Sequence, residues 1–225
     1  EGQNFPFSLF QTFRTLLIRN LGFDLLGYRV VPTQRQGVGF TAISVEPVCE
    51  QFFITPKEVM ATDSLERRLC VLRKYANRTI HELYDQTIDS FYISTCSAKT
   101  IVYKGQLTTS QLKPYFTDLS DKRVISALAL VHSRFSTNTA PKWKLAQPFR
   151  YIAHNGEINT IQGNVNWMKS KANLLKNSLF TPEELNLLLP ICDSNRSDSS
   201  NLDNVVEVLT LSGRPMADVM MITEA

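Results

Sequence analysis

The sequence lacks the residue patterns of several protein classes. No two of its four cysteines form a Cys-x-x-Cys pair, and 20 or more residues separate each from the next: they are Cys49, Cys70, Cys96 and Cys192. This spacing does not fit a zinc site and instead predicts free thiols in a reducing compartment. With only three histidines in 225 residues, a histidine-rich metal site is not expected either.

Long apolar runs and strong charge are missing as well. No apolar run approaches the ~20 residues of a transmembrane helix, so no membrane partner is expected. The 24 Lys and Arg residues nearly balance the 21 Asp and Glu residues, and the net charge is +3. Without a basic stripe, no nucleic-acid partner is expected. The chain starts with neither Met nor a signal peptide, which indicates a sequence that begins in mid-chain.

The hydrophobic content of 43% is ordinary for a globular core, and its periodicity predicts both helices and strands. Helices are expected over Phe5–Gly27 (stopped by Gly22 or Gly27), after an N-cap at Ser64, over Val165–Leu175, after an N-cap at Thr181, and over Asn201–Leu211. Short strands and turns are expected over Tyr28–Pro32, Gly37–Ser44 and Gln51–Ile54, a hairpin over Ser90–Gly105, a buried strand over Leu128–Val131 and a further strand over Phe149–Ala153. This mixture favours layered sheets with helices outside, as either α+β or α/β.

An arginine among small polar residues follows the Leu128–Val131 segment. Arg134 stands two residues after His132, in a loop that also holds Ser133, Ser136 and Thr137. A guanidinium can hold a carboxylate through two parallel hydrogen bonds, and such a loop can line a ligand pocket. A surface ion pair within an ordinary turn fits the same residues, and the local sequence leaves both interpretations open.

The Phe149–Ala153 segment runs into His154-Asn155-Gly156. An Asn-Gly turn can offer a side-chain N–H and a backbone N–H to a developing oxyanion, although Asn-Gly is also a common hairpin turn. His154 fits a catalytic base or, with greater preference, a neutral histidine bonded to the backbone.

Asp198 precedes the Asn201–Leu211 helix in a serine-rich stretch. Its carboxylate can receive a substrate ammonium. The structural alternative is an N-cap region in which a neighbouring Ser or Asn caps the helix. The chain shows no obvious nucleophile to accompany Arg134, the Asn-Gly turn and Asp198.

Taken together, the motifs resemble the class II, N-terminal-nucleophile glutamine amidotransferase domain of glutamate synthases. The resemblance is nearly continuous over Ser126–Trp167, and its densest motifs are LAQPF (Leu145–Phe149), AHNGEINT (Ala153–Thr160), GNVNW (Gly163–Trp167), SDSSNLDN (Ser197–Asn204) and SGR (Ser212–Arg214). It implies an α+β fold, the four-layer αββα sandwich of N-terminal-nucleophile hydrolases, here partial and without its first segment. Residues 1–225 are then part of one amidotransferase domain.

The resemblance also implies a reaction and a role for each site residue. Glutamine is hydrolysed to glutamate and ammonia. Arg134 binds the α-carboxylate of glutamine and Asp198 binds its α-ammonium. The Asn155 side chain and the Gly156 backbone N–H form the oxyanion hole.

The family's nucleophile is absent from its expected position. In that family it is a cysteine at the first position of the mature chain, and its own α-amino group serves as base. Residue 1 here is Glu, and none of the four internal cysteines carries an N-terminal amine. We therefore expect a fragment that lacks the nucleophile and shows no glutaminase turnover alone.

For the complete protein, the resemblance implies that ammonia passes to a synthase domain of the same polypeptide, which makes glutamate from 2-oxoglutarate. FMN and an iron–sulfur cluster belong to that missing part, and no cofactor site is expected in this segment. Electrons come from ferredoxin or from an NADPH-oxidising subunit. The SDSSNLD motif leans towards ferredoxin, which suits a plastid stroma or a bacterial cytoplasm.

Two alternatives remain open. A nucleophile-free glutamine-binding or regulatory domain predicts a natural N-terminus near Glu1 and saturable glutamine binding. An interaction module that keeps only the fold predicts that Arg134→Ala and Asp198→Ala change nothing. The two ends look cut, which argues against the first alternative. The joint presence of the arginine, the Asn-Gly turn and the aspartate argues against the second.

Overall fold

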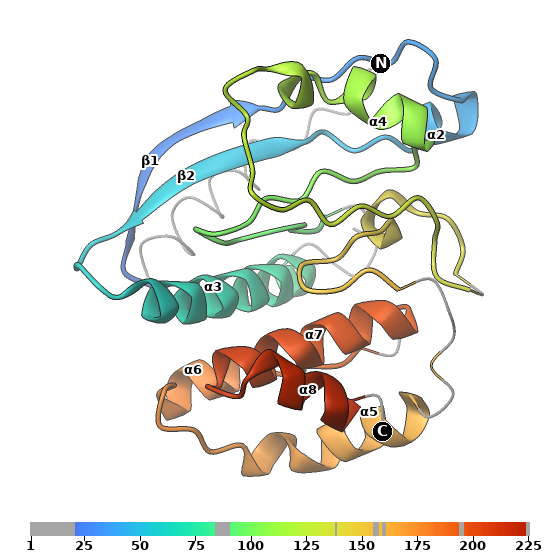
Figure 1. The fold of residues 1–225 in the computed structure, drawn as a ribbon. Coiled ribbons are helices and arrows are strands. Elements are labelled where there is room, and N and C mark those ends of the chain that lie inside the picture. The colour runs from blue at the N-terminus through green and yellow to red at the C-terminus, as the bar shows by residue number, and fades with distance from the viewer. Residues whose placement is uncertain are drawn as a thin grey trace.

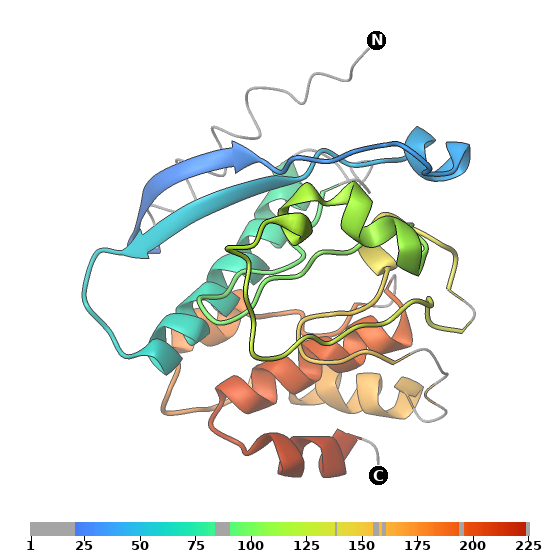
Figure 2. The same cartoon turned by 45° about the horizontal axis from the view of Figure 1, so that its top comes forward.

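The computed structural model describes residues 21–83, 91–137, 139–154, 158, 161–193 and 196–223. Its elements in chain order are β1 (Phe23–Val30), α2 (Phe40–Ser44), β2 (Glu50–Pro56), α3 (Thr62–Leu83), α4 (Thr109–Tyr115), η2 (Thr117–Ser120), η3 (Trp143–Leu145), α5 (Ile161–Lys171), η4 (Ala172–Leu174), α6 (Pro182–Leu187), α7 (Asp198–Leu211) and α8 (Met216–Thr223). The β1–β2 ribbon lies on one side of the molecule and α5 to α8 lie on the other (Figures 1 and 2). Helix α3 lies between them, and the described part is α+β (Figure 1).

The strands β1 and β2 form an antiparallel ribbon that covers one face of α3. Phe23 pairs with Pro56 at one end and Val30 pairs with Glu50 at the other. The register shifts between Leu25 and Gly27, as at a β-bulge. Burial alternates along β1, as expected when one face of a strand packs on a core.

Helix α3 is buried on two faces because its apolar residues do not form a single stripe. Leu69 and Leu72 pack beneath Phe23 of β1. Val71, on another face, packs with Leu188, which directly follows α6. The helix also carries charged residues, among them Arg67 and Lys74, so it is amphipathic with apolar contacts on two sides. α3 therefore joins the ribbon to the C-terminal helices.

The start of α6 confirms its predicted sequence signal. The N–H of Glu184 donates to Thr181 Oγ1 at 3.2 Å, and the N–H of Thr181 donates to Glu184 Oε2 at 2.9 Å. This reciprocal pair is a capping box, with Pro182 at the first helical position. The predicted strand at Gln51–Ile54 is confirmed by β2, and the helix expected over Val165–Leu175 by α5 and η4.

Other predicted boundaries need correction. Residues 23–27 belong to β1, so the helix expected up to Gly27 does not extend through them, and its residues before 21 lie outside the described part. Within Gly37–Ser44, where short strands and turns were expected, Phe40–Ser44 form the short helix α2. Helix α3 begins at Thr62, before the predicted cap at Ser64. Helix α7 begins at Asp198 rather than Asn201, because Ser197 caps it.

Three predicted strand segments are not strands. At the predicted hairpin, the turn forms, but its groups bond to α3: Ser97 Oγ donates to Glu66 Oε2 at 2.8 Å. The arms Phe91–Thr95 and Thr100–Tyr103 form no strand. Residues Leu128–Val131 are exposed rather than buried, and no described strand pairs with them.

The Phe149–Ala153 segment turns on itself instead of forming a strand. The N–H of Phe149 donates to the carbonyl of Ile152 at 3.0 Å. The next backbone donors, from Tyr151 and Ile152, bond to the carboxylate of Asp203 in α7 at 2.7 and 3.2 Å. A side chain of α7 thus takes the place of a neighbouring strand.

Candidate functional site

A buried cluster of hydroxyl and amide groups joins three segments that are far apart in the sequence. Ser136 Oγ donates to Ser199 Oγ at 2.8 Å, and Ser199 Oγ donates to the carbonyl oxygen of His154 at 2.8 Å. Gln147 Nε2 donates to Ser136 Oγ at 3.0 Å and to the same carbonyl at 2.8 Å. The side chains of Ser136, Gln147 and Ser199 are buried. We call these three side chains and the His154 carbonyl the serine–glutamine cluster.

The serine–glutamine cluster brings together the segments in which the sequence predicts a ligand site. Ser136 lies two residues after Arg134, and Ser199 directly follows Asp198. His154 directly precedes Asn155 and Gly156, which lie outside the described residues. The structure therefore places the arginine loop against the first turn of α7, with the chain leading to the Asn-Gly turn bonded to both.

Arg134 lies in an irregular loop, and its side chain is exposed. Its backbone N–H donates to Nδ1 of His132 at 3.0 Å, which fixes the local turn and gives His132 a backbone partner. The Arg134 guanidinium is therefore on the surface. The backbone of its loop is fixed by the His132 contact and, two residues further on, by buried Ser136.

Asp198 is the first residue of α7 and is partly buried. The cap of α7 comes from Ser197, whose side chain accepts the N–H of Ser200, so the Asp198 carboxylate is not needed as the cap. A negative charge in the first turn of a helix is stabilised by the helix dipole. Asp198 is thus an acidic residue in the first turn of α7 whose side chain the helix cap does not use.

His154 contacts the first turn of α7 through both its ring and its backbone carbonyl. Nδ1 of His154 lies 3.5 Å from Ser199 Oγ, and its carbonyl accepts the hydrogen bonds of the cluster. The ring contact is therefore to a side chain, and the bonds that anchor this segment are made by the backbone carbonyl of His154 rather than by its ring.

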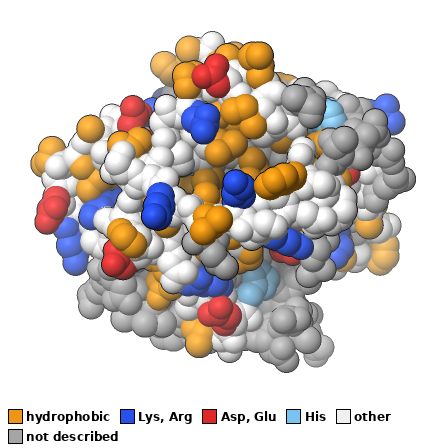
Figure 3. Space-filling model, turned by 90° about the horizontal axis from the view of Figure 1, so that it is seen from below, with side chains coloured by type: hydrophobic (Ala, Val, Ile, Leu, Met, Phe, Trp, Pro, Cys, Tyr) orange, Lys and Arg blue, Asp and Glu red, His pale blue; other side chains and the backbone are white. Residues whose placement is uncertain are grey.

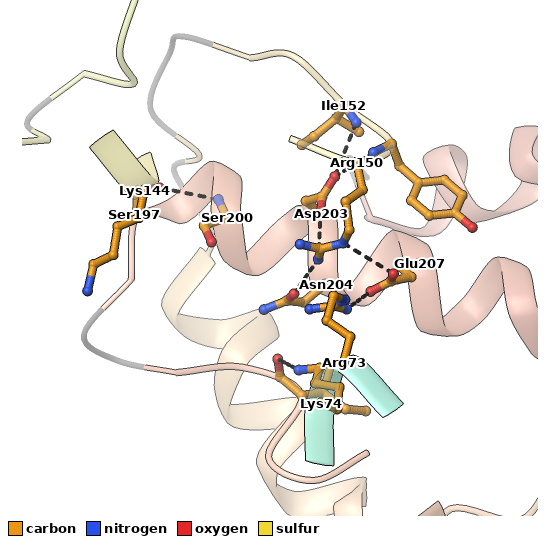
Figure 4. A network of polar contacts seen from close by, with 12 residues as sticks. Arg73, Lys74, Lys144, Arg150, Ile152, Ser197, Ser200, Asp203, Asn204 and Glu207 are labelled. Atoms are coloured by element: carbon orange, nitrogen blue, oxygen red, sulfur yellow. Dashed lines mark hydrogen bonds and ion pairs between the residues drawn. The ribbon is translucent and has the colours of Figure 1, made fainter. Parts of the chain in front are cut away.

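A second buried cluster, made of charged groups, holds the chain before His154 against α7 (Figure 4). Arg150 Nε donates to Glu207 Oε1 at 3.1 Å, and its Nη2 donates to Asn204 Oδ1 at 2.6 Å. The same Nη2 pairs with Asp203 Oδ2 at 2.8 Å. Arg73 of α3 forms an ion pair with Glu207 from the other side. The charge cluster therefore links α3, α7 and the segment that leads into the serine–glutamine cluster.

Burial and charge act in opposite directions on the pKa values in this cluster. Burial raises the pKa of Asp203, although Arg150 opposes the shift. Burial acts to raise the pKa of Glu207 too, but Arg73 and Arg150 outweigh it and the pKa is lowered. For Lys104, outside this cluster, burial and the charge of Arg150 act in the same direction and lower the pKa to about 7. Glu207 is thus kept ionised by the two arginines that it bonds.

The sequence reasoning missed the charge cluster, although a signal for it exists. Arg150 stands between Phe149 and Ile152 in an apolar stretch, and Asp203 and Glu207 stand four residues apart within the apolar part of α7. Charged side chains are rarely buried unless they are paired. Charges inside apolar runs of two separate segments therefore indicate buried ion pairs between them.

The internal cysteines are poor candidates for the missing nucleophile. Burial raises the pKa of Cys49 to about 11 and those of Cys70 and Cys96 to about 12. It also raises the pKa of Cys192. Because the thiolate is the nucleophilic form, these groups are unreactive thiols at neutral pH.

The described residues contain no group of three or more His, Cys, Asp or Glu side chains placed to hold a metal ion. Among them there is also no helix long and apolar enough to cross a membrane. On the face shown in Figure 3, Lys and Arg side chains lie scattered among hydrophobic and uncharged ones.

Comparison with known families identifies the class. The sequence profile of the class-II glutamine amidotransferases matches residues 10–225, and the chain belongs to this family.

Three individual relatives show which proteins of this family the chain is similar to. The chain is similar to the ferredoxin-dependent glutamate synthase of Antithamnion sp., with 42% identity over 199 residues, which are 88% of this chain and 13% of the relative. It is 44% identical to the glutamate synthase [NADPH] large chain of Bacillus subtilis over 91% of this chain and 13% of the relative. It is also 44% identical to the glutamate synthase [NADH] of Schizosaccharomyces pombe, over 94% of this chain and 10% of the relative. The chain thus spans only about a tenth of the length of these relatives.

Proposed function

We propose that this chain forms the glutamine-binding and oxyanion-stabilising part of the glutaminase domain of a glutamate synthase. The observation that carries the proposal is the serine–glutamine cluster, in which Ser136 and Ser199 are in direct hydrogen-bond contact. That contact ties the loop of Arg134 to the helix turn of Asp198, and family membership supplies glutamine as the ligand.

The charges of Arg134 and Asp198 match the head of an α-amino acid. A free amino acid carries a carboxylate and an ammonium on one carbon, so two opposite charges on adjoining segments can bind both. In the proposed site Arg134 pairs with the carboxylate and Asp198 pairs with the ammonium. The Asn155 side chain and the Gly156 N–H then stabilise the negative oxygen that forms when the side-chain amide is attacked.

In the proposed reaction a nucleophile attacks the side-chain amide of glutamine. The proposed nucleophile is an N-terminal cysteine, as in the resemblance described above, and the buried internal thiols do not replace it. The chain as given is therefore proposed to bind glutamine without releasing ammonia.

The fold of the complete domain is also part of the proposal. We place residues 1–225 within one amidotransferase domain with the αββα sandwich of N-terminal-nucleophile hydrolases. Membership of the class-II amidotransferases supports this placement. The two-stranded ribbon and the flanking helices would be parts of that sandwich.

For the whole protein we propose the glutamate synthase reaction, in which ammonia passes to a synthase domain that makes glutamate from 2-oxoglutarate. FMN and an iron–sulfur cluster would lie in that domain. The names of the relatives support ferredoxin, NADPH or NADH as the electron source. A plastid stroma or a bacterial cytoplasm is the proposed location, supported by relatives from chloroplasts and from Bacillus subtilis.

The test is calorimetric titration of this chain with L-glutamine, together with an assay for ammonia. We expect saturable binding without ammonia release. Arg134→Ala and Asp198→Ala should each weaken binding by about 10- to 100-fold, because each removes hydrogen bonds to a charged group. The matched control is Arg123→Ala, which removes another exposed arginine of the same irregular segment, one that pairs locally with Asp121.

Each of two results would overturn the proposal. Absence of glutamine binding by a chain with intact circular dichroism would remove its basis. Equal binding by Arg134→Ala, Asp198→Ala and Arg123→Ala would show that glutamine binds elsewhere.

A further inference from the structure

The serine–glutamine cluster has no solvent-facing surface of its own, which separates it from ligand-contacting groups. Ser136, Gln147 and Ser199 are 4%, 6% and 0% exposed. Ser136 Oγ, Ser199 Oγ and Gln147 Nε2 bond to one another and to the His154 carbonyl, while Gln147 Oε1 has no hydrogen-bond partner among the described residues. Buried polar groups cost free energy unless they are bonded, so these bonds favour a fixed geometry of the segments that carry them.

We propose that Ser136, Gln147 and Ser199 determine specificity for the α-amino-acid head of the ligand, by fixing the spacing between Arg134 and Asp198. This inference rests on the proposed function. The two charged residues belong to separate segments, a surface loop and the first turn of α7. The Ser136–Ser199 hydrogen bond is the direct bond between those segments. Gln147 holds Ser136 in place from a third segment.

A fixed spacing between Arg134 and Asp198 affects ligands with two charges differently from ligands with one. A carboxylate and an ammonium on the same carbon are a short, fixed distance apart. Both can be paired at once only if Arg134 and Asp198 keep a matching spacing. A ligand that carries only the carboxylate needs no such match. Loosening the cluster should therefore weaken L-glutamine but spare the ligand with one charge.

The experiment compares L-glutamine with glutaramate, which has the same carbon chain, amide and carboxylate but no ammonium. Both dissociation constants are measured by titration for the chain and for Ser136→Ala, Ser199→Ala and Gln147→Met. The unaltered chain should prefer L-glutamine. Each variant should lose about tenfold or more of this preference, through weaker L-glutamine binding and nearly unchanged glutaramate binding.

The matched control is Ser212→Ala at the opposite end of α7. Ser212 Oγ donates to the Val208 carbonyl at 2.7 Å, so the variant also removes a serine-to-carbonyl hydrogen bond from the same helix. We expect it to leave the preference unchanged. Three cluster variants are used so that the test survives if one of them fails to fold, as judged by circular dichroism.

The outcomes separate this inference from the proposed function. If the unaltered chain binds no L-glutamine, the proposed function fails and the inference fails with it. If the chain prefers L-glutamine and folded cluster variants keep that preference, the inference alone is wrong. Equal weakening of both ligands would also contradict it, because that result indicates general loosening of the pocket rather than lost spacing.

Discussion

At the scale of single residues, Arg73 and Glu207 show how this fold removes charges from water. Their side chains are 2% and 6% exposed and form an ion pair between α3 and α7. Arg150 adds a second positive partner to the same carboxylate. A buried pair contributes little net stability against a well-packed apolar pair, but removing one partner leaves an unpaired charge in the core.

We therefore expect Glu207→Gln to destabilise the chain strongly. The substitution keeps the size of the side chain but leaves Arg73 and Arg150 without the negative charge that both bond. Its cost should be about 3–5 kcal/mol in the free energy of unfolding. Urea denaturation followed by circular dichroism measures this loss.

The control, Glu82→Gln, alters a carboxylate that is 67% exposed and pairs with Arg78 one turn away. It should change the free energy of unfolding by less than about 0.5 kcal/mol. Similar losses in the free energy of unfolding for the two substitutions would show that the buried ion pair matters no more than the exposed one.

At the scale of elements, the short helix α6 depends on its first turn. It has six residues, and a helix of that length is not stable by itself. Thr181→Ala removes the hydroxyl that accepts the N–H of Glu184, so we expect a loss of about 1 kcal/mol. The control is Thr109→Ala at the first residue of α4, where the side chain is exposed. Chemical denaturation of both variants measures the difference. Equal free energies of unfolding for the two variants would mean that packing against α3, rather than the cap, stabilises α6.

The elements that the sequence predicted well are those whose signals are local. The capping box at Thr181 and the apolar residues of α3 lie within single helices, so neighbouring sequence is sufficient to find them. One predicted strand, Phe149–Ala153, failed because a distant side chain took over its backbone donors. Asp203 does this for Tyr151 and Ile152. No local pattern reports such a long-range contact.

In the candidate site, too, local motifs could be predicted and long-range contacts could not. Arg134, the Asn-Gly turn and Asp198 were predicted because their motifs are contiguous in the sequence and resemble a family. The bonds that connect these motifs were not predicted, because Ser136, Gln147 and Ser199 read as ordinary loop and cap residues. Their burial becomes apparent only when three segments meet.

At the scale of the whole molecule, the described part exposes several apolar side chains, and residues 124–131 form one contiguous stretch of them. Within residues 124–131, the side chains of Ile125, Leu128 and Val131 are 87%, 84% and 67% exposed. Isolated exposed apolar residues are common on folded proteins, but contiguous groups favour association. This segment leads directly to Arg134, so the site lies beside a surface prone to contact.

We expect the purified chain to self-associate through this stretch. Sedimentation velocity should show a mean mass that rises with concentration, and the double variant Ile125→Ser and Leu128→Ser should reduce the rise. Because these side chains are exposed, their replacement should alter the free energy of unfolding by less than about 0.5 kcal/mol. Val59→Ser is the matched control, since Val59 is fully exposed in the loop between β2 and α3, away from the stretch in sequence. A monomer at every concentration, or equal effects of the control and the double variant, would contradict the expectation. Self-association that the double variant alone abolishes would identify residues 124–131 as the surface through which the chain associates.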